Sequence, residues 1–135
     1  MIKYLLDTNH ASRLMSSDER ILDQLRVAGD AGDEFAISMT VVGELYFAVH
    51  ASRHYLRNLQ RLTQLINALQ IFPFDRAAAE EFGRIQAEQK AKGRPIPSLD
   101  AQIAAVARHY SLILLTADKH FDAVDGVTVE NWLTN

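Results

Sequence analysis

A chain of 135 residues has the length of a single domain, and 14 Lys and Arg against 17 Asp and Glu give it a net charge of −3. This balance excludes a chain-wide basic field that would hold nucleic acid nonspecifically, so any contact with nucleic acid has to be local. The absence of cysteine excludes disulfides, thiolate metal sites and thiol catalysis, and no apolar run is long enough for a membrane span or a signal-peptide core. We expect one cytoplasmic domain, residues 1–135, that makes no contact with a membrane.

Strand and helix patterns alternate in the first third of the chain. Residues 2–6 form a short β-prone run, and Asp7-Thr8-Asn9 directly after it can stop a strand and cap a helix. Another helix is expected from Asp18 to the turn-rich residues 28–33, and a second strand follows at residues 34–38.

Two helices are expected between residues 40 and 69. Thr40 can cap the first of them, which has Val41, Leu45 and Ala48 on one face. The second helix carries an apolar stripe, and the chain can bend between the two helices near Ser52. The stripe consists of Leu56, Leu59, Leu62, Ile66 and Leu69.

A strand and a long helix come next. Residues 71–74 predict the third strand, which ends at Asp75, the expected cap of a helix over residues 77–92. Residues 93–97, Gly-Arg-Pro-Ile-Pro, interrupt this helix because proline lacks the backbone N–H that a helix interior requires.

The last part of the chain completes an α/β pattern. Ser98 begins a helix in which Leu99 and Ile103 are expected to be buried. The continuous apolar run at residues 112–115 is typical of a central parallel strand, and residues 127–129 predict a weaker last strand. Alternating strands and helices imply right-handed crossovers, so we expect a three-layer α/β/α sandwich with a mostly parallel sheet of about five strands.

Four acidic side chains are expected at one edge of that sheet. Asp7 ends the first strand and Asp118 follows the fourth, while Glu44 and Asp100 lie near the starts of helices. In parallel sheets these positions meet at the carboxyl ends of the strands, where ligands bind. Asp7 and Asp118 could be simple caps, and Asp100 could be an acid favoured by the helix dipole. Glu44 is harder to explain in this way, because it shares an otherwise apolar helix face.

The acidic residues taken together indicate a metal site. Burying unpaired carboxylates is costly, and their mutual repulsion raises their pKa values unless a cation lies between them. Oxygen ligands suit Mg²⁺ or Mn²⁺, and an ion of this kind can activate water and orient a phosphodiester. The sequence therefore predicts metal-dependent phosphodiester hydrolysis.

Four segments, in order along the chain, contain these acidic residues. They are residues 5–9 (LLDTN), 41–45 (VVGEL), 96–105 (IPSLDAQIAA) and 115–121 (LTADKHF). The segments resemble the motifs of PIN-domain ribonucleases, and the closest subgroup is the VapC-type toxins. The ending at residues 129–132 (VENW) is also similar, so the resemblance spans nearly the whole chain. It implies a compact PIN-like fold, Mg²⁺- or Mn²⁺-dependent cleavage of RNA, a homodimer, and inhibition by a cognate antitoxin.

Position by position, the resemblance implies roles for individual residues. The three central acidic ligands and catalytic residues are Asp7, Glu44 and Asp100. Asp118 is our choice for the fourth acidic position, with Asp122 as the alternative, because family members vary between Asn and acidic residues in this segment. His120 stands where an acidic residue often precedes the phenylalanine, so the sequence leaves open whether one or two ions bind.

Further polar residues are candidates for supporting roles. Asn9 and Thr116 are expected to orient carboxylates and waters. Lys119, beside the predicted site, is the best candidate for a phosphate contact, and Arg94 is a helix-end charge that could form a substrate rim. Arg53 and Arg57 belong to a basic stripe that is either a solvated face or a contact for RNA or the antitoxin.

Other functional classes fit less well. A catalytically weak PIN domain that only binds RNA or protein is the main alternative, but such a domain would be expected to lose acidic residues. A signalling receiver domain needs paired acids after its first strand, and a haloacid-dehalogenase-type phosphatase needs Asp-x-Asp, where this chain has Asn9. The glycines form neither a dinucleotide-binding motif nor a P-loop.

Overall fold

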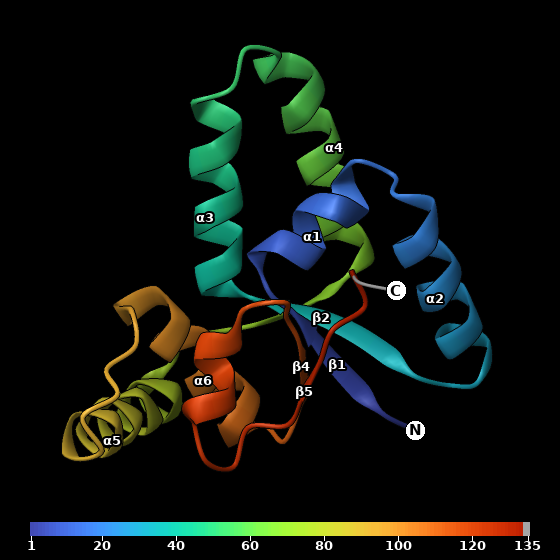
Figure 1. Ribbon diagram of the computed structural model, residues 1–135. Coiled ribbons are helices and arrows are strands. Elements are labelled where there is room, and N and C mark those ends of the chain that lie inside the picture. Colours follow the sequence, from blue (N-terminus) through green and yellow to red (C-terminus); the bar gives the residue numbers. More distant parts are fainter. Residues whose placement is uncertain (134–135) are drawn as a thin grey trace.

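The computed structural model describes residues 1–133 and contains a five-stranded sheet in which every pairing is parallel (Figure 1). The strands are β1 (Lys3–Leu6), β2 (Glu34–Ser38), β3 (Gln70–Phe72), β4 (Ile113–Leu115) and β5 (Val129–Glu130). Their order across the sheet is β3-β2-β1-β4-β5. The expectation of a parallel sheet of about five strands is confirmed.

Helices connect the strands and cover both faces of the sheet. They are α1 (Thr8–Met15), α2 (Glu19–Asp30), α3 (Met39–His50), α4 (Tyr55–Ala68), α5 (Arg76–Ala91), α6 (Ser98–His109) and the short 3₁₀ helix η1 (Lys119–Ala123). The chain runs outward from β1 to β3 and then returns to β4 on the other side of β1. Because crossovers are right-handed, this reversal puts α5 and α6 on the face opposite to α1 and α2, as Figure 1 shows.

The two central strands form a buried platform. Leu5 and Leu6 of β1 and Leu114 and Leu115 of β4 are fully buried. Helix α6 packs its small side chains, from Ala101 to Ala107, into the same core. The carboxyl ends of β1 and β4 are therefore anchored in the packed core, which fixes the positions of the residues that follow them.

The helix caps differ from the sequence prediction at one position. Asp7, Asp18 and Asp75 cap α1, α2 and α5 through their side chains. Helix α3, however, begins at Met39, two residues earlier than a cap at Thr40 would allow, and the Ser38 hydroxyl oxygen accepts the hydrogen bond from the Val41 N–H at 3.2 Å. The expectation that Thr40 caps α3 is therefore wrong.

Three apolar side chains that were expected on buried helix faces lie at the surface. Leu56, the first residue of the predicted stripe, is 74% exposed in the first turn of α4, where the buried side chains are Leu62 and Leu65 further along the helix. Leu99 is 46% exposed, because the buried residues of α6 begin only at Ala101. Ala48 is also exposed, since the buried face of α3 follows the i, i+4 spacing of Leu45 and Val49.

The C-terminal segment packs back onto the start of the chain. The Trp132 ring lies 4.9 Å from the Tyr4 ring of β1 and 5.8 Å from the Phe35 ring of β2, measured between centroids. Trp132 thus fixes the described end of the chain against the first two strands. Within the described residues, no helix combines the length and the apolar character needed to cross a membrane.

Candidate active site

The strand order of the sheet reverses beside β1, and acidic residues follow both strands at this point. Asp7 comes directly after β1, and Asp118 lies just beyond the neighbouring β4. The Asp7 N–H donates a hydrogen bond to the Leu115 carbonyl oxygen at 3.0 Å, which holds the two strand ends side by side. Such a reversal is the usual ligand-binding position in an open parallel sheet.

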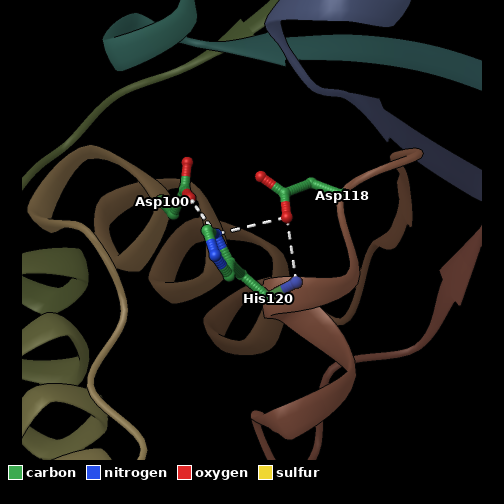
Figure 2. A group of neighbouring side chains, drawn as sticks. All are labelled: Asp100, Asp118 and His120. Carbon is green, nitrogen blue, oxygen red and sulfur yellow. Dashed lines mark hydrogen bonds and ion pairs between the residues drawn. The ribbon is translucent and has the colours of Figure 1, made fainter.

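Asp100, Asp118 and His120 form a contiguous cluster at this edge (Figure 2). Asp100 comes from the first turn of α6, and Asp118 caps η1 by accepting a hydrogen bond from the His120 N–H at 2.9 Å. The His120 Nδ1 atom lies 3.3 Å from an Asp100 oxygen and 3.2 Å from an Asp118 oxygen. The imidazole therefore stands between two carboxylates that the sequence predicted as ligands.

The electrostatics of Asp100 show that the carboxylates influence one another. Burial raises the pKa of Asp100, and the charges of Asp118 and Asp7 raise the same pKa further, although His120 opposes the rise. Negative charge is thus concentrated where water is partly excluded. A cation among these side chains would relieve this unfavourable concentration of charge.

Glu44 reaches the same region from the opposite layer of helices. It lies in the second turn of α3, and its Oε1 atom accepts a hydrogen bond from the Thr8 hydroxyl at 2.7 Å. Thr8 directly follows Asp7, so this bond ties Glu44 to the end of β1. Thr8 was not among the predicted site residues, although a hydroxyl next to an expected ligand was a usable signal.

Asp7 is buried and makes two hydrogen bonds through one oxygen. Its Oδ1 atom accepts from the His10 N–H at 2.9 Å, which caps α1, and lies 3.1 Å from the His10 Nδ1 atom. Asp7 therefore does cap α1, as the simpler explanation predicted. This cap does not exclude a ligand role, because only one of the two carboxylate oxygens is engaged.

The donor set fits a divalent metal ion. One donor atom each from Asp100, Asp118 and His120 lie within 4.8 Å of one another. Clustered carboxylates with a raised pKa at Asp100 are the surroundings in which Mg²⁺ or Mn²⁺ binds through oxygen. The nitrogen of His120 adds a donor that suits transition metals better than Mg²⁺. The sequence had left this residue without a role.

Comparisons with known proteins agree with this geometry. Residues 4–127 match the PIN domain family. The chain is 31% identical to "Ribonuclease VapC2" of Haemophilus influenzae over 98% of the chain and 100% of that protein. It is 30% identical to "tRNA(fMet)-specific endonuclease VapC" of Shigella flexneri over 98% of the chain and 99% of that protein. The chain belongs to the PIN-domain family.

Its relatives place this PIN domain in the VapC group, as the motifs indicated. The same fold occurs in the crystal structure of VapBC2 from Rickettsia felis bound to a DNA fragment from their promoter. The two chains share 25% identity with a TM-score of 0.90, and the match covers 97% of this chain and 99% of the other. The PIN-like α/β architecture expected from the motifs is confirmed over the full length.

The structure gives different surroundings to the remaining site candidates of this PIN domain. Thr116 is buried, and its hydroxyl oxygen accepts a hydrogen bond from the Asp118 N–H at 3.0 Å, which shapes the loop that carries Asp118. Asn9 is exposed in the first turn of α1. Asp122 is exposed on η1, and Asp118 rather than Asp122 is grouped with Asp100.

The four basic candidates fall into two regions. Arg94 and Lys119 line an open hollow of about 400 Å³ together with Asp118 and His120. Arg53 lies in the turn between α3 and α4 and Arg57 in the first turn of α4, at the end of this hairpin that is distant from the sheet in Figure 1. Only the first pair therefore borders the acidic cluster.

Proposed function

We propose that the protein is an endoribonuclease of the VapC type that uses Mg²⁺ or Mn²⁺ to cleave RNA phosphodiesters in the cytoplasm. The observation that carries the proposal is the convergence of four elements on one acidic edge. The four acidic residues that come to this edge are Asp7 at the end of β1, Glu44 in the second turn of α3, Asp100 in the first turn of α6 and Asp118 in the loop after β4. The names of the two VapC relatives support the same activity.

The acidic residues would hold the metal, and their neighbours would orient them. Asp7, Glu44, Asp100 and Asp118 supply the ligands, with Asp122 as the alternative for the last position. The bound ion supplies a water of lowered pKa and neutralises charge on the phosphodiester. Thr8 and Thr116 position ligands through the hydrogen bonds described above, and Asn9 is a third candidate for this role.

RNA would enter over the hollow beside the acidic cluster. Lys119 and Arg94 are cations on its wall, and both can bind phosphate oxygens as the scissile bond approaches Asp118. Arg53 and Arg57 would contact a more distant part of a large folded RNA or the antitoxin. Because one relative is named as a tRNA(fMet)-specific endonuclease, transfer RNA is the first substrate class to test.

A cognate antitoxin is the expected inhibitor, as for other VapC toxins. An apolar depression between α1, α3 and α4 is lined by Met15, Leu45 and Val49, and a second one between α1, α2 and α4 by Leu14, Leu25 and Leu65. Met15 and Arg61 border both depressions, so a peptide could cover them in series. Its C-terminal end would place a basic side chain, such as Arg, among the carboxylates and compete with metal.

We further expect a homodimer, with one face of α3 as its interface. Met39, Tyr46 and Phe47 lie on this face and are all exposed, Phe47 by 75%. Large exposed apolar side chains grouped on one helix face are typical of interaction surfaces. Gly43, between them, keeps the face flat enough for close helix contact.

The decisive experiment measures RNA cleavage with and without metal. Purified protein free of antitoxin is incubated with total RNA in Mg²⁺, in Mn²⁺ and in EDTA, and the new RNA ends are sequenced. We expect discrete cuts that require metal and disappear in EDTA or in Asp100→Asn. Undiminished cutting in EDTA would overturn the metal proposal, and RNA binding without cutting would favour a catalytically weak binding module.

A second experiment tests the partner. The gene is expressed alone and with its neighbouring small open reading frame, and growth and RNA cleavage are compared. We expect the partner to suppress both effects and to lose this ability when its C-terminal basic residue is replaced by alanine. Suppression that does not depend on any residue of the partner's C-terminal segment would contradict the proposed mode of inhibition.

A further inference from the structure

His10 is a fully buried histidine in the first turn of α1, and both of its ring nitrogens have partners. The Nδ1 atom lies 3.1 Å from Asp7 Oδ1, and the Nε2 atom lies 3.1 Å from the backbone nitrogen of Trp132. His10 therefore connects the first acidic residue of the site to a segment 122 positions further along the chain. The sequence motifs predict no role for this residue.

The second contact determines where the ring carries its hydrogen. A backbone N–H can only donate, so the Nε2 atom of His10 has to accept the hydrogen bond from Trp132 and carries no hydrogen. In the neutral ring the hydrogen is then on Nδ1, which donates to Asp7 Oδ1. The Trp132 N–H thus selects the tautomer that is able to hold Asp7.

Holding Oδ1 in this way has a consequence for the second oxygen of Asp7. Oδ1 accepts two hydrogen bonds, one from the His10 N–H and one from the His10 ring, and these fix the rotation of the carboxylate. Within residues 1–133, no hydrogen bond or ion pair engages Oδ2. Asp7 follows β1 beside the end of β4, the strand that leads to Asp118, and its charge acts on Asp100, so this carboxylate faces the region of the acidic cluster.

We infer that His10 is a positioning residue for the metal site: it locks Asp7 through Oδ1 so that Oδ2 is presented to the cation, and the C-terminal segment holds His10 in the required tautomer. The inference rests on the proposed function, since it gives Asp7 the role of a metal ligand. Hydrogen bonds from a histidine to a ligating carboxylate typically change metal affinity ten- to a hundredfold when they are lost.

The C-terminal segment is suited to this task because it is itself well anchored. The Trp132 ring packs against Tyr4 and Phe35 on β1 and β2, and its indole N–H donates to Glu130 at 3.0 Å. Tyr4 and Asp7 belong to the same short segment at the start of the chain. The Trp132 N–H, His10 and Asp7 therefore form one chain of hydrogen bonds whose two ends rest on the sheet.

If His10 only stabilised the fold, its replacement by Asn or by Gln would affect metal binding equally. The two variants therefore separate a structural role from a positioning role. The side-chain amide of Asn lies at the distance of Nδ1 from the backbone and can donate to Asp7, whereas the amide of Gln lies at the distance of Nε2 and can only serve Trp132. Leucine removes both contacts. The readout is the dissociation constant of Mn²⁺, measured by isothermal titration calorimetry on protein that is folded by circular dichroism.

We expect His10→Asn to bind Mn²⁺ within about threefold of wild type, and His10→Gln and His10→Leu to bind about ten- to a hundredfold more weakly. Leu62→Ala, a buried change on α4, is the control that destabilises the fold without touching Asp7. Its Mn²⁺ affinity should equal that of wild type. Equal affinity in folded His10→Gln and wild type, or equal losses in His10→Asn and His10→Gln, would overturn the inference.

A second measurement needs no variant. Long-range ¹H–¹⁵N NMR of wild-type protein distinguishes a protonated Nδ1 from a protonated Nε2. We expect hydrogen on Nδ1 alone. The opposite tautomer would overturn the inference even if every variant failed to fold.

Failure of the proposed function would give a different result. In that case wild-type protein itself would bind no Mn²⁺ at the site, and Asp100→Asn would change nothing.

Discussion

Asp7 combines a structural and a chemical role in one side chain, and the two can be separated. Its Oδ1 atom caps α1 and contacts His10, while Oδ2 is the oxygen proposed for the cation. In Asp7→Asn, the amide oxygen can still accept both hydrogen bonds, so the fold should persist. The lost charge removes metal affinity and stabilisation of the transition state, and RNA cleavage should fall by at least about a hundredfold.

The measurement for Asp7→Asn pairs cleavage in Mn²⁺ with thermal stability in EDTA. Without metal, the variant should be as stable as wild type or more stable, because a repulsive charge near Asp100 has been removed. Asp18→Asn is the matched control, since Asp18 also caps a helix but lies beyond the C-terminal end of α1, whereas Asp7 lies at its start. It should keep full activity. An active Asp7→Asn protein would contradict the assignment of Asp7 as a ligand.

The hydroxyl of Thr8 gives a second prediction at the residue scale. It donates the 2.7 Å hydrogen bond that orients Glu44, and valine has the same shape without this donor. We expect Thr8→Val to lower kcat about ten- to a hundredfold with little change in melting temperature, and Thr8→Ser to restore most of the activity. If Thr8→Ser were as impaired as Thr8→Val, the methyl group and not the hydroxyl would matter.

Sequence alone was enough to propose the acidic residues as ligands, but not the side chains that hold them. Asp7 and Asp118 follow predicted strands, and Glu44 interrupts an apolar face, so pattern and chemistry were enough. His10 could not be assigned in this way, because its second partner is a backbone N–H at Trp132, across the whole chain. Contacts of this kind depend on the tertiary fold and on a rotamer, and neither has a local signature in the sequence.

Among the elements, α5 and α6 are joined by an ion-pair network that supports the helix carrying Asp100. Arg108 of α6 donates to Glu81 at 2.6 Å and to Glu88 at 2.8 Å, both on α5, and its guanidinium is largely buried. Burial alone raises the pKa of Glu81, but Arg108 and Arg84 outweigh this effect and lower the pKa below its ordinary 4.5. The charged form of Glu81 is therefore favoured by folding.

This network predicts a pH dependence of stability. A carboxylate with a lowered pKa in the folded state contributes stability above about pH 4.5, and this contribution is lost as the pH falls through the folded pKa. Glu81→Gln should cost about 1.5–3 kcal/mol at pH 7, the range for hydrogen bonds to charged groups, and progressively less as the pH falls below about 4.5. Urea unfolding of both proteins at several pH values measures the difference.

The neighbouring Glu80 provides the control for Glu81. It pairs with Arg84, but both side chains are more than half exposed, and such surface pairs contribute little. Glu80→Gln should therefore change stability by a few tenths of a kcal/mol at every pH. A cost for Glu81→Gln that is the same at pH 4 and pH 7 would show that its charge is not what stabilises the helix pair.

At the element scale, the sequence predicted which segments are helices and strands better than where they begin. The alternation of patterns was sufficient for the parallel sheet because each crossover needs a helix. The start of α3 was misplaced because Ser38 and Thr40 are both good caps, and only the end of β2 decides between them. The exposure of Leu99 depends on where α6 meets the sheet, and hydrophobic periodicity in the sequence does not predict that position.

At the scale of the whole molecule, the exposed face of α3 predicts the effect of a surface charge on assembly. We expect wild type to be a dimer by light scattering and Phe47→Asp to weaken the dimer by about 2 kcal/mol or more, the value of an interface hot spot. Leu56→Asp on α4 is the control, because Leu56 is equally exposed but lies outside this face. A monomeric wild type, or dimers unaffected by Phe47→Asp, would contradict the proposed interface.

Metal binding should also stabilise the molecule as a whole, because the proposed ligands come from segments that are far apart in the chain and meet only when it is folded. One acidic residue directly follows β1, one lies on α3, one on α6 and one in the loop before η1, so the unfolded chain cannot reproduce the site. An ion that binds only the folded state adds about 2.7 kcal/mol at one hundred times its dissociation constant, which is roughly 10 °C in melting temperature for a chain of this size. We expect this rise with Mn²⁺ in wild type, almost none in Asp7→Asn or Asp100→Asn, and the normal rise in Asp18→Asn. A melting temperature that is indifferent to saturating Mn²⁺ in wild type would show that the four carboxylates do not act together on one ion, whatever their proximity.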